Sequence, residues 1–172
     1  MINFLDISYL RIGNEKQVKV YQILTANKVL EKLAAYKPIL VGTVPINIDI
    51  ENSDLDIICD VSDRDEFVDQ LTAVFGSHQD FFVSESPKFD AIKVTFKIED
   101  FEIEIFGQNK PTTQQNAYLH MLIEYKLLLE KGEEFRQEII SLKKQGYKTE
   151  PAFAKLLGIE GNAYEELLKL DA

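Results

Sequence analysis

Two aspartates separated by one residue stand in the stretch 41–60, VGTVPINIDIENSDLDIICD. Asp54 and Asp56 come just before the apolar run 57–59, so we expect a strand that projects both carboxylates from one face. Two like charges on one face repel each other unless a cation lies between them. Carboxylate oxygens on a rigid strand suit Mg²⁺ or Mn²⁺. The spacing is compatible with a metal-binding pair, although for this strand taken alone we prefer the interpretation of an ordinary acidic, half-exposed strand.

The stretch 101–107, FEIEIFG, repeats the alternation of acidic and apolar residues. Its acids, Glu102 and Glu104, share one face of a predicted strand. If this strand lies beside the strand of the aspartates, three or four carboxylates converge, and a metal ion would explain such a cluster. Alternation does not separate the two glutamates. We favour Glu104 slightly, because it lies nearer the strand end at Gly107, where sites tend to lie.

The elements that position these acids can be read from hydrophobic periodicity and from turn residues. Apolar residues at helical intervals predict one long amphipathic helix over 15–35, which Pro38 ends. A short buried strand, ILVG, follows, and DLDIICDV is the next strand. Ser62 and Asp65 have the spacing of a capping box, so they predict the start of a helix that stops at Gly76.

The second half of the chain changes from strands to helices. Residues 81–106 read as β structure, including a hairpin of AIKVTFKI and FEIEIFG joined by a tight turn. After Pro111 only helical segments follow, over 115–131, 133–145, 151–157 and 160–170. We therefore predict an α+β fold, a mixed sheet flanked by helices in residues 1–110, with a C-terminal helical extension over residues 111–172 packed on it.

Composition limits the partners. The chain has 172 residues, 45% of them hydrophobic and 28% charged, with a formal net charge of −10. Such a charge repels a long polyanion, so we expect no extended nucleic-acid partner, although a metal-bound nucleotide remains compatible. We also expect no membrane span and no signal peptide. The lone cysteine, Cys59, fits inert packing in a reduced, cytoplasmic protein.

The order of these motifs resembles the nucleotidyltransferase superfamily, which includes the polymerase-beta-like enzymes. Its signature is an apolar residue, a small turn, a spacer of about ten residues, an acid–apolar–acid–apolar strand and a third acid from a later strand. The matching residues here are Val41, Gly42, Thr43, Asp54, Leu55, Asp56 and Ile57. More closely, the chain resembles a family of bacterial proteins of unknown function within that superfamily. The shared stretches are 42–59, 102–108, 115–125 and 148–158, which span most of the sequence.

The resemblance implies a Mg²⁺-dependent transfer of a nucleoside monophosphate group from an NTP to a small-molecule or protein acceptor of unknown identity. Asp54 and Asp56 would hold Mg²⁺ on the triphosphate, and Glu104 or Glu102 would bind a second ion and help to deprotonate the acceptor. The nucleotide-binding candidates are Gly42, Thr43 and Ser53. Two ions, Mg²⁺ or Mn²⁺, are the implied cofactors.

The sequence also departs from the superfamily. The spacer VPINIDIENS reads as extended, where many relatives carry a short helix. Few basic residues are placed to hold a triphosphate; the nearest are Lys88, Lys93 and Lys110. The alternative function is therefore a catalytically degenerate module that binds a nucleotide or a protein partner. Hydrolysis of a nucleotide by the same carboxylates is a third, weaker hypothesis.

Three further side chains are candidates for contacts with a nucleotide. His120 lies one helical turn before Glu124, a spacing that could orient the imidazole, although we favour an ordinary surface pair. Gln108 and Gln115 follow the second acidic strand and could reach a base or a sugar. Polar residues at a junction between a strand and a helix are more often caps, which is the interpretation we prefer.

Overall fold

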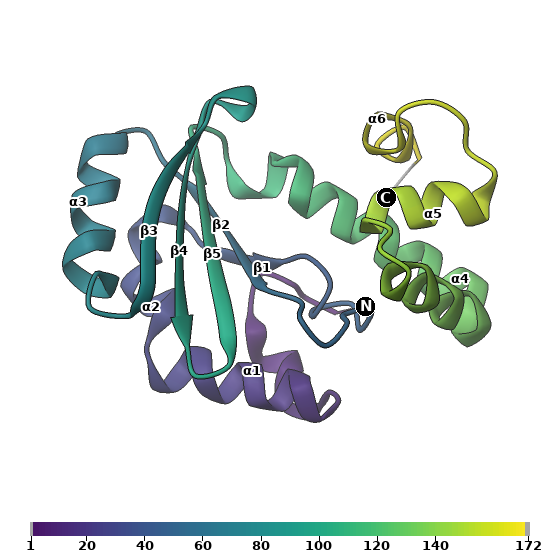
Figure 1. Ribbon diagram of the computed structural model, residues 1–172, viewed down its shortest axis with the longest axis horizontal. Helices are drawn as coiled ribbons and strands as arrows, with labels where there is room; N and C mark the ends of the chain where they lie inside the picture. The colour runs from purple at the N-terminus through teal and green to yellow at the C-terminus, as the bar shows by residue number, and fades with distance from the viewer. Residues whose placement is uncertain (1, 171–172) are drawn as a thin grey trace. The chain divides into compact units, whose positions relative to one another are not determined.

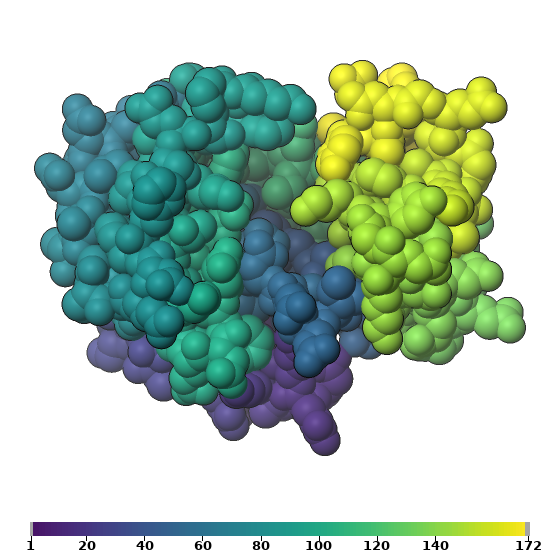
Figure 2. All heavy atoms as spheres, in the orientation of Figure 1, coloured from purple at the N-terminus to yellow at the C-terminus, as the bar shows by residue number. Residues whose placement is uncertain are grey.

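The computed structural model describes residues 2–170 and divides the chain into two compact units (Figure 1). The first unit runs to Val41 and resumes over Asp54–Gln115. The second unit consists of Gly42–Ser53 and the chain from Asn116 onward, whose helical residues have the green to yellow colours of Figure 2. Among the described helices, none has both the length and the apolar character that crossing a bilayer requires.

The first unit is built on a five-stranded mixed sheet with the strand order β1-β2-β5-β4-β3. The strands are β1 (Ile39–Val41), β2 (Leu55–Asp60), β3 (Gln79–Ser86), β4 (Ala91–Ile98) and β5 (Phe101–Gln108). The pair β2 and β5 is parallel, and every other neighbouring pair is antiparallel. The predicted strands and the β4–β5 hairpin are confirmed, and β3 adds an edge strand that the predicted hairpin lacked.

Helices cover one face of this sheet. They are α1 (Glu15–Ala26), α2 (Val29–Lys32) and α3 (Arg64–Phe75). Short 3₁₀ helices lie elsewhere in the chain, at Ile7–Ile12, Ala34–Tyr36, Pro87–Phe89 and Thr112–Gln114. Phe75 of α3 stacks on Phe96 of β4, with ring centroids 4.7 Å apart. Gly107 of β5 lies under the same helix: a Cβ there would be 2.7 Å from the ring of Phe67. The side chains that alternate with these point to the opposite face.

Two helix boundaries differ from the prediction. The expected helix over 15–35 is broken at Lys28, whose φ of 53° lies in the left-handed region, so that α1 and α2 are separate. The cap of α3 is Asp63, whose carboxylate accepts from the backbone N–H of Glu66 at 3.0 Å, and not Ser62. The helix ends at Gly76, as predicted.

The second unit contains the helical extension. Its helices are α4 (Asn116–Lys144), α5 (Thr149–Leu157) and α6 (Ala163–Leu167). Gly132 has a non-helical backbone (φ 83°, ψ −168°), which separates α4 into two helical runs as the sequence predicted. Phe135 packs edge-on against Phe153, with ring centroids 5.7 Å apart, and so joins α4 to α5.

The spacer 44–53 has turns at 44–47 and 51–52 and is not the extended segment that alternation predicted. The backbone N–H of Ile48 donates to the carbonyl of Thr43 at 3.1 Å, and that of Asn47 to Val44 at 3.2 Å. Two cationic side chains of α4 donate hydrogen bonds to backbone carbonyls of this spacer. Arg136 donates to the carbonyl of Ile46 at 2.6 Å, and the ammonium of Lys143 donates to that of Ile48 at 2.9 Å. These side chains satisfy carbonyls that a neighbouring strand would otherwise pair.

Candidate metal centre

Three carboxylates meet on the face of the sheet opposite α3. Asp54, Asp56 and Glu104 each offer an oxygen, and these oxygens lie within 4.8 Å of one another. The parallel register of β2 and β5 places Asp56 directly beside Glu104. Asp54 comes directly before β2, and Asp56 is the second residue of that strand. The two residues are two positions apart along an extended chain, so both carboxylates project to the same side. The expectation that the two acidic strands are neighbours is confirmed.

Local sequence fixes the orientation of the two aspartates. Leu55 and Ile57 are buried, with at most 1% of their surfaces exposed, and they anchor β2 to the core. The intervening Asp56 is half-buried, and its partner on β1 is the buried Val41. Asp56 thus lies between the apolar Val41 on β1 and the carboxylate of Glu104 on β5. This position is partly desolvated, and partial desolvation strengthens the attraction between a carboxylate and a cation.

Glu102 lies outside this cluster among the described residues. It is exposed, and its partner across the antiparallel pair is Lys97 of β4. Two positions along β5, Glu104 stands opposite Thr95. The structure therefore brings Glu104, and not Glu102, to the aspartates.

An ammonium group is already in contact with the cluster. Lys93 Nζ lies 2.9 Å from Glu104 Oε2 and donates a hydrogen bond to it. That bond raises the pKa of Lys93, and the charges of Glu104, Asp54 and Glu102 act in the same direction against partial burial. The side chain is therefore a cation across the physiological range. Lys93 is one of the three lysines that the sequence offers for contact with a triphosphate. In the sheet it stands opposite Phe106, so its contact with Glu104 is a diagonal one between β4 and β5.

The predicted phosphate loop belongs to the second unit. Gly42 has a φ of 79°, a left-handed backbone that suits glycine. The hydroxyl of Thr43 lies 3.5 Å from that of Ser53, and Ser53 Oγ accepts from the backbone N–H of Ile50 at 2.9 Å. These bonds hold the two ends of the loop together. A role in nucleotide binding stays a prediction.

Two glutamine candidates are engaged by backbone carbonyls. The side-chain amide of the buried Gln115 donates to Cys59 and to Lys110, each at 2.9 Å. Gln108 donates to Phe89 at 2.8 Å. Gln115 thereby joins the end of β2 to the segment after β5. Burial raises the pKa of the Cys59 thiol, in agreement with inert packing.

His120 and Glu124 do not form the surface pair that we favoured. Both are buried, with 6% and 4% of their surfaces exposed. His120 Nε2 lies 2.8 Å from the carbonyl oxygen of Tyr164, and Nδ1 lies 3.6 Å from a carboxylate oxygen of Glu150. The second unit buries this face of α4 under α5 and α6, which the helical spacing alone did not reveal.

The sequence reasoning missed an ionisable cluster around Glu124. Burial raises the pKa of Glu124 well above its ordinary value, and the charge of Glu150 raises it further, whereas Lys143 opposes both. Within residues 2–170, Glu124 Oε1 finds no hydrogen-bond partner. The available signal was an acid on the apolar stripe of a predicted helix, one turn after a histidine.

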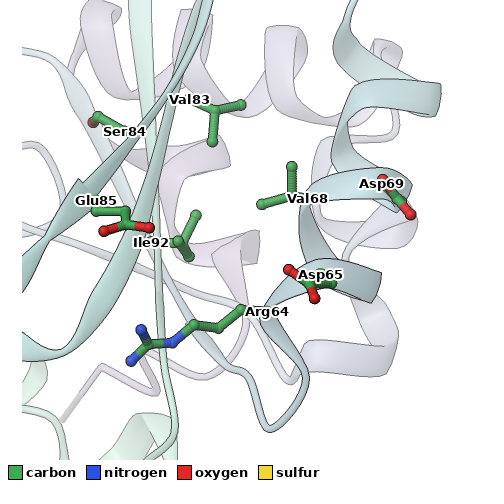
Figure 3. Close-up of a pocket in the computed structure, with 8 residues that line it drawn as sticks. All are labelled: Arg64, Asp65, Val68, Asp69, Val83, Ser84, Glu85 and Ile92. Atoms are coloured by element: carbon green, nitrogen blue, oxygen red, sulfur yellow. The ribbon is translucent and has the colours of Figure 1, made fainter.

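Figure 3 shows a surface pocket of the first unit, whose lining does not include Asp54, Asp56 or Glu104. Its walls include Arg64 and Val68 of α3, and Val83 and Glu85 of β3. Ile92 of β4 also lines it and pairs with Gly107, so the pocket lies on the helix-covered face of the sheet. None of the predicted site residues lines this pocket.

Solved structures with a similar fold include a poly(U) polymerase and an RNA terminal U-transferase. The Cid1 poly(U) polymerase bound to MgGTP is 14% identical, with a TM-score of 0.57 over 76% of this chain and 42% of that chain. A chain of the GLD-2/RNP-8 complex is 10% identical, with a TM-score of 0.57 over 88% of this chain and 61% of that one. A cytoplasmic RNA terminal U-transferase is 12% identical, with a TM-score of 0.51 over 76% and 38%. The chain thus spans between about two fifths and three fifths of these structures.

The likeness shows a nucleotidyltransferase-like fold: a mixed sheet with flanking helices and a helical C-terminal part. No curated protein matches the chain in sequence. A family does match, over residues 22–170, and its description is a domain of unknown function, DUF4269. Because this match covers most of the sequence, the chain belongs to the DUF4269 family.

Proposed function

We propose that this protein is a Mg²⁺-dependent nucleotidyltransferase, which moves a nucleoside monophosphate group from an NTP to a small-molecule or protein acceptor. The observation that carries the proposal is the meeting of Asp54, Asp56 and Glu104 within 4.8 Å on a nucleotidyltransferase-like sheet. Acidic residues close together are common in acidic proteins. Here, however, two adjacent parallel strands supply them in the order and spacing of the superfamily signature.

The three side chains suit a hard divalent cation. All three donors are carboxylate oxygens, the ligands that Mg²⁺ and Mn²⁺ prefer. Each group is half-buried, and Asp56 and Glu104 lie on paired strands, so little entropy is lost when they bind an ion. When bound, Mg²⁺ would offset the negative charge of the triphosphate and polarise its phosphorus–oxygen bonds.

We assign the roles of the protein side chains from the superfamily resemblance. Asp54 and Asp56 would hold the ion that binds the triphosphate, and Glu104 would accept the proton of the acceptor hydroxyl. The acceptor oxygen then forms a bond to the α-phosphorus, and pyrophosphate leaves. Gly42 and Thr43 of the loop are assigned to the β- and γ-phosphates on the strength of the superfamily resemblance. The net charge of −10 favours a neutral or cationic acceptor over a nucleic acid.

A nucleotide-binding module without turnover is the second candidate. The ion pair between Lys93 and Glu104 favours it, because a carboxylate that is held by an ammonium is less available to accept a proton or to bind a metal ion. Such a module would bind Mg²⁺ and a nucleotide through the two aspartates alone. The two functions differ in what Glu104 does.

Thermal unfolding with each of the four common NTPs, with and without Mg²⁺, tests the binding step. A ligand at about one hundred times its dissociation constant adds about 2.7 kcal/mol, which raises Tm by about 5–10 °C at this chain length. The double variant Asp54→Asn with Asp56→Asn should lose the rise. Glu102→Gln is the matched control, since it neutralises an acid of the neighbouring strand β5 that lies outside the cluster. A rise that is equal in all proteins, or absent with every nucleotide, would refute the assignment.

Transfer is tested next with the preferred NTP carrying a labelled α-phosphate. Release of pyrophosphate, with the label retained on a metabolite or protein fraction, supports the enzyme. Glu104→Gln should keep the Mg²⁺-dependent stabilisation and lose the transfer. Nucleotide binding with no transfer to any fraction, and no change on Glu104→Gln, would favour the binding module.

A further inference from the structure

Two phenylalanine rings lie beside the carboxylate cluster, on the face of the sheet opposite α3. Phe106 follows Glu104 by two positions on β5, so the two side chains share a face and stand about 7 Å apart along the strand. Phe89 ends the 3₁₀ helix that joins β3 to β4, and its ring packs edge-on against Phe106, with ring centroids 6.1 Å apart. Phe106 is half-buried, and 46% of Phe89 is exposed. The pair therefore presents an aromatic surface next to the proposed metal centre.

The backbone that carries Phe89 is tethered from two sides. The side-chain amide of Gln108 on β5 donates to the carbonyl of Phe89 at 2.8 Å. Arg64 of α3 donates to the carbonyl of Asp90 at 2.6 Å and also forms an ion pair with its carboxylate. A ring on a tethered backbone loses less conformational freedom when a ligand stacks on it, so less binding energy is lost to ordering.

The strand order places the two rings on the acceptor side of the cluster. In the order β1-β2-β5-β4-β3, the strand of the aspartates lies between β1 and β5. Gly42 and Thr43, which we assign to the β- and γ-phosphates, follow β1 directly in the chain. In phosphoryl transfer the attacking and leaving oxygens lie roughly in line, on opposite sides of the phosphorus. With pyrophosphate toward β1, the acceptor approaches from β5, which carries Glu104 and Phe106 and contacts Phe89.

The charges near the rings favour a neutral or cationic ligand. The Nζ atom of Lys88 lies 5.2 Å from the ring centroid of Phe89, so this ring already attracts a cation. Lys88 is exposed, and its ammonium can turn away when a ligand takes its place. The ammonium of Lys93, which stands opposite Phe106, is already bound to Glu104. The net charge of −10 acts against an anionic acceptor as well.

We propose that Phe89 and Phe106 bind the acceptor, a neutral or cationic small molecule that carries a planar ring and a hydroxyl group. This inference rests on the proposed function and names the class of its acceptor. Planar rings stack on aromatic side chains, and two side chains offer far less area than the roughly 800 Å² that each partner of a stable protein complex buries. With the ring stacked, the hydroxyl reaches Glu104, which takes its proton. The acceptor oxygen bonds to the α-phosphorus, the bond from that phosphorus to the pyrophosphate oxygen breaks, and pyrophosphate leaves.

Tryptophan fluorescence tests the aromatic site without activity. The chain has no tryptophan, so Phe89→Trp supplies a single reporter whose emission falls when a planar ring stacks on it. Phe82→Trp is the matched control, because Phe82 is 63% exposed and lies on β3, two strands away from β5. The probes are tyramine and adenosine, one cationic and one neutral, with the ring-free 3-aminopropanol and ribose as their counterparts. At least one ring-bearing probe should lower the emission of Phe89→Trp. The ring-free probes, and Mg²⁺ with an NTP alone, should leave it unchanged, and the control should respond to none of them.

Transfer of a labelled α-phosphate to the same probes separates acceptor binding from nucleotide binding. Phe89→Ala should raise the KM for the accepting probe about tenfold, the effect of one lost stacking contact, and keep the Mg²⁺-dependent stabilisation by the NTP. Phe89→Tyr should behave as wild type, because it keeps the ring. Phe82→Ala should also behave as wild type.

Different failures of these experiments have different meanings. No response of Phe89→Trp to either ring-bearing probe, an equal response to the ring-free ones, or an unchanged KM in Phe89→Ala would overturn the aromatic acceptor site and leave the proposed function standing. Emission that falls with Mg²⁺ and an NTP alone would also overturn it, because the rings would then bind the base of the nucleotide. Label transferred only to protein would do the same. No Mg²⁺-dependent stabilisation of wild type by any NTP would overturn the proposed function itself, and this inference with it.

Discussion

Replacing Glu124 with glutamine is expected to stabilise the protein at neutral pH. The side chain is buried on α4, and its Oε1 finds no hydrogen-bond partner within the described residues. Burial raises its pKa well above the ordinary value, and Glu150 adds to this, whereas the opposing effect of Lys143 is smaller. Glutamine keeps the shape and cannot ionise, so the fold no longer has to hold a proton that the unfolded chain releases.

The pH dependence of the unfolding free energy follows from the protons that Glu124 binds in the folded and unfolded states. Below about pH 4 the carboxyl group of Glu124 is protonated in both the folded and the unfolded state. The difference in unfolding free energy between wild type and Glu124→Gln is therefore constant with pH in this range. Above the unfolded pKa the folded state binds more protons, and the unfolding free energy of wild type falls with pH. The fall is up to about 1.4 kcal/mol per pH unit until the folded pKa is passed. For a chain of this length that corresponds to about 3–6 °C in Tm per unit.

The assay is thermal or urea unfolding of both proteins from pH 4 to pH 8. Glu130→Gln is the matched control, because it removes an exposed acid from the same helix. The advantage of Glu124→Gln should grow with pH, and that of the control should stay nearly flat. An advantage that is constant with pH, or a variant less stable than wild type at pH 7, would refute the reasoning. The second result would mean that Glu124 is ionised and paired with Lys143.

Three smaller predictions concern the first unit. Gly107→Ala should lower the unfolding free energy in urea by about 1–3 kcal/mol, because its Cβ would lie 2.7 Å from the Phe67 ring. Asp63→Ala should cost about 1 kcal/mol through loss of the α3 cap, whereas Ser62→Ala should be neutral; equal losses would contradict the assignment of the cap. Cys59 should react with a thiol reagent only on unfolding, and fast reaction in the native protein would contradict its burial.

Most of the sheet could be predicted because its strands have one buried face. Alternation identified β4 and β5, and the apolar run 57–59 identified β2. The edge strand β3 was not separated, since its eight residues are exposed or half-buried on both faces and leave no period of two. The break at Lys28 was also missed, because a left-handed backbone at a lysine has no reliable sequence signal.

The burial of residues on α4 by helices that follow later in the chain could not be predicted from local sequence. His120 and Glu124 form a local pattern that fits a surface pair. Their burial comes from α5 and α6, whose residues lie from about twenty-five to more than forty positions further along the chain. The turns of 42–53 have the same kind of cause: Arg136 and Lys143 of α4 bind the carbonyls of that loop. Tertiary contacts, and not local propensity, decide these segments.

The sequence could not determine whether Glu102 or Glu104 joins the two aspartates. Both lie on the same face of β5, so the period of two cannot separate them. Parallel pairing places Asp56 beside Glu104, and a shift by two residues would have kept every side chain on its face and selected another acid. The register is a property of two strands more than forty residues apart, and the sequence of either strand alone does not contain it.

The close approach of Asp54, Asp56 and Glu104 makes their carboxylates repel one another, which destabilises the folded protein when no cation is bound. Two charges within 4.8 Å of each other repel by about 1 kcal/mol or more even at the dielectric constant of water, and by more in a half-buried setting. Lys93 offsets part of this for Glu104. The core of β2 depends on Leu55 and Ile57, so an amide in place of either aspartate would relieve the repulsion without disturbing the packing. A divalent ion on Asp54 and Asp56 recovers that energy, and this is the physical reason to seek the function of the protein in what the ion would bind.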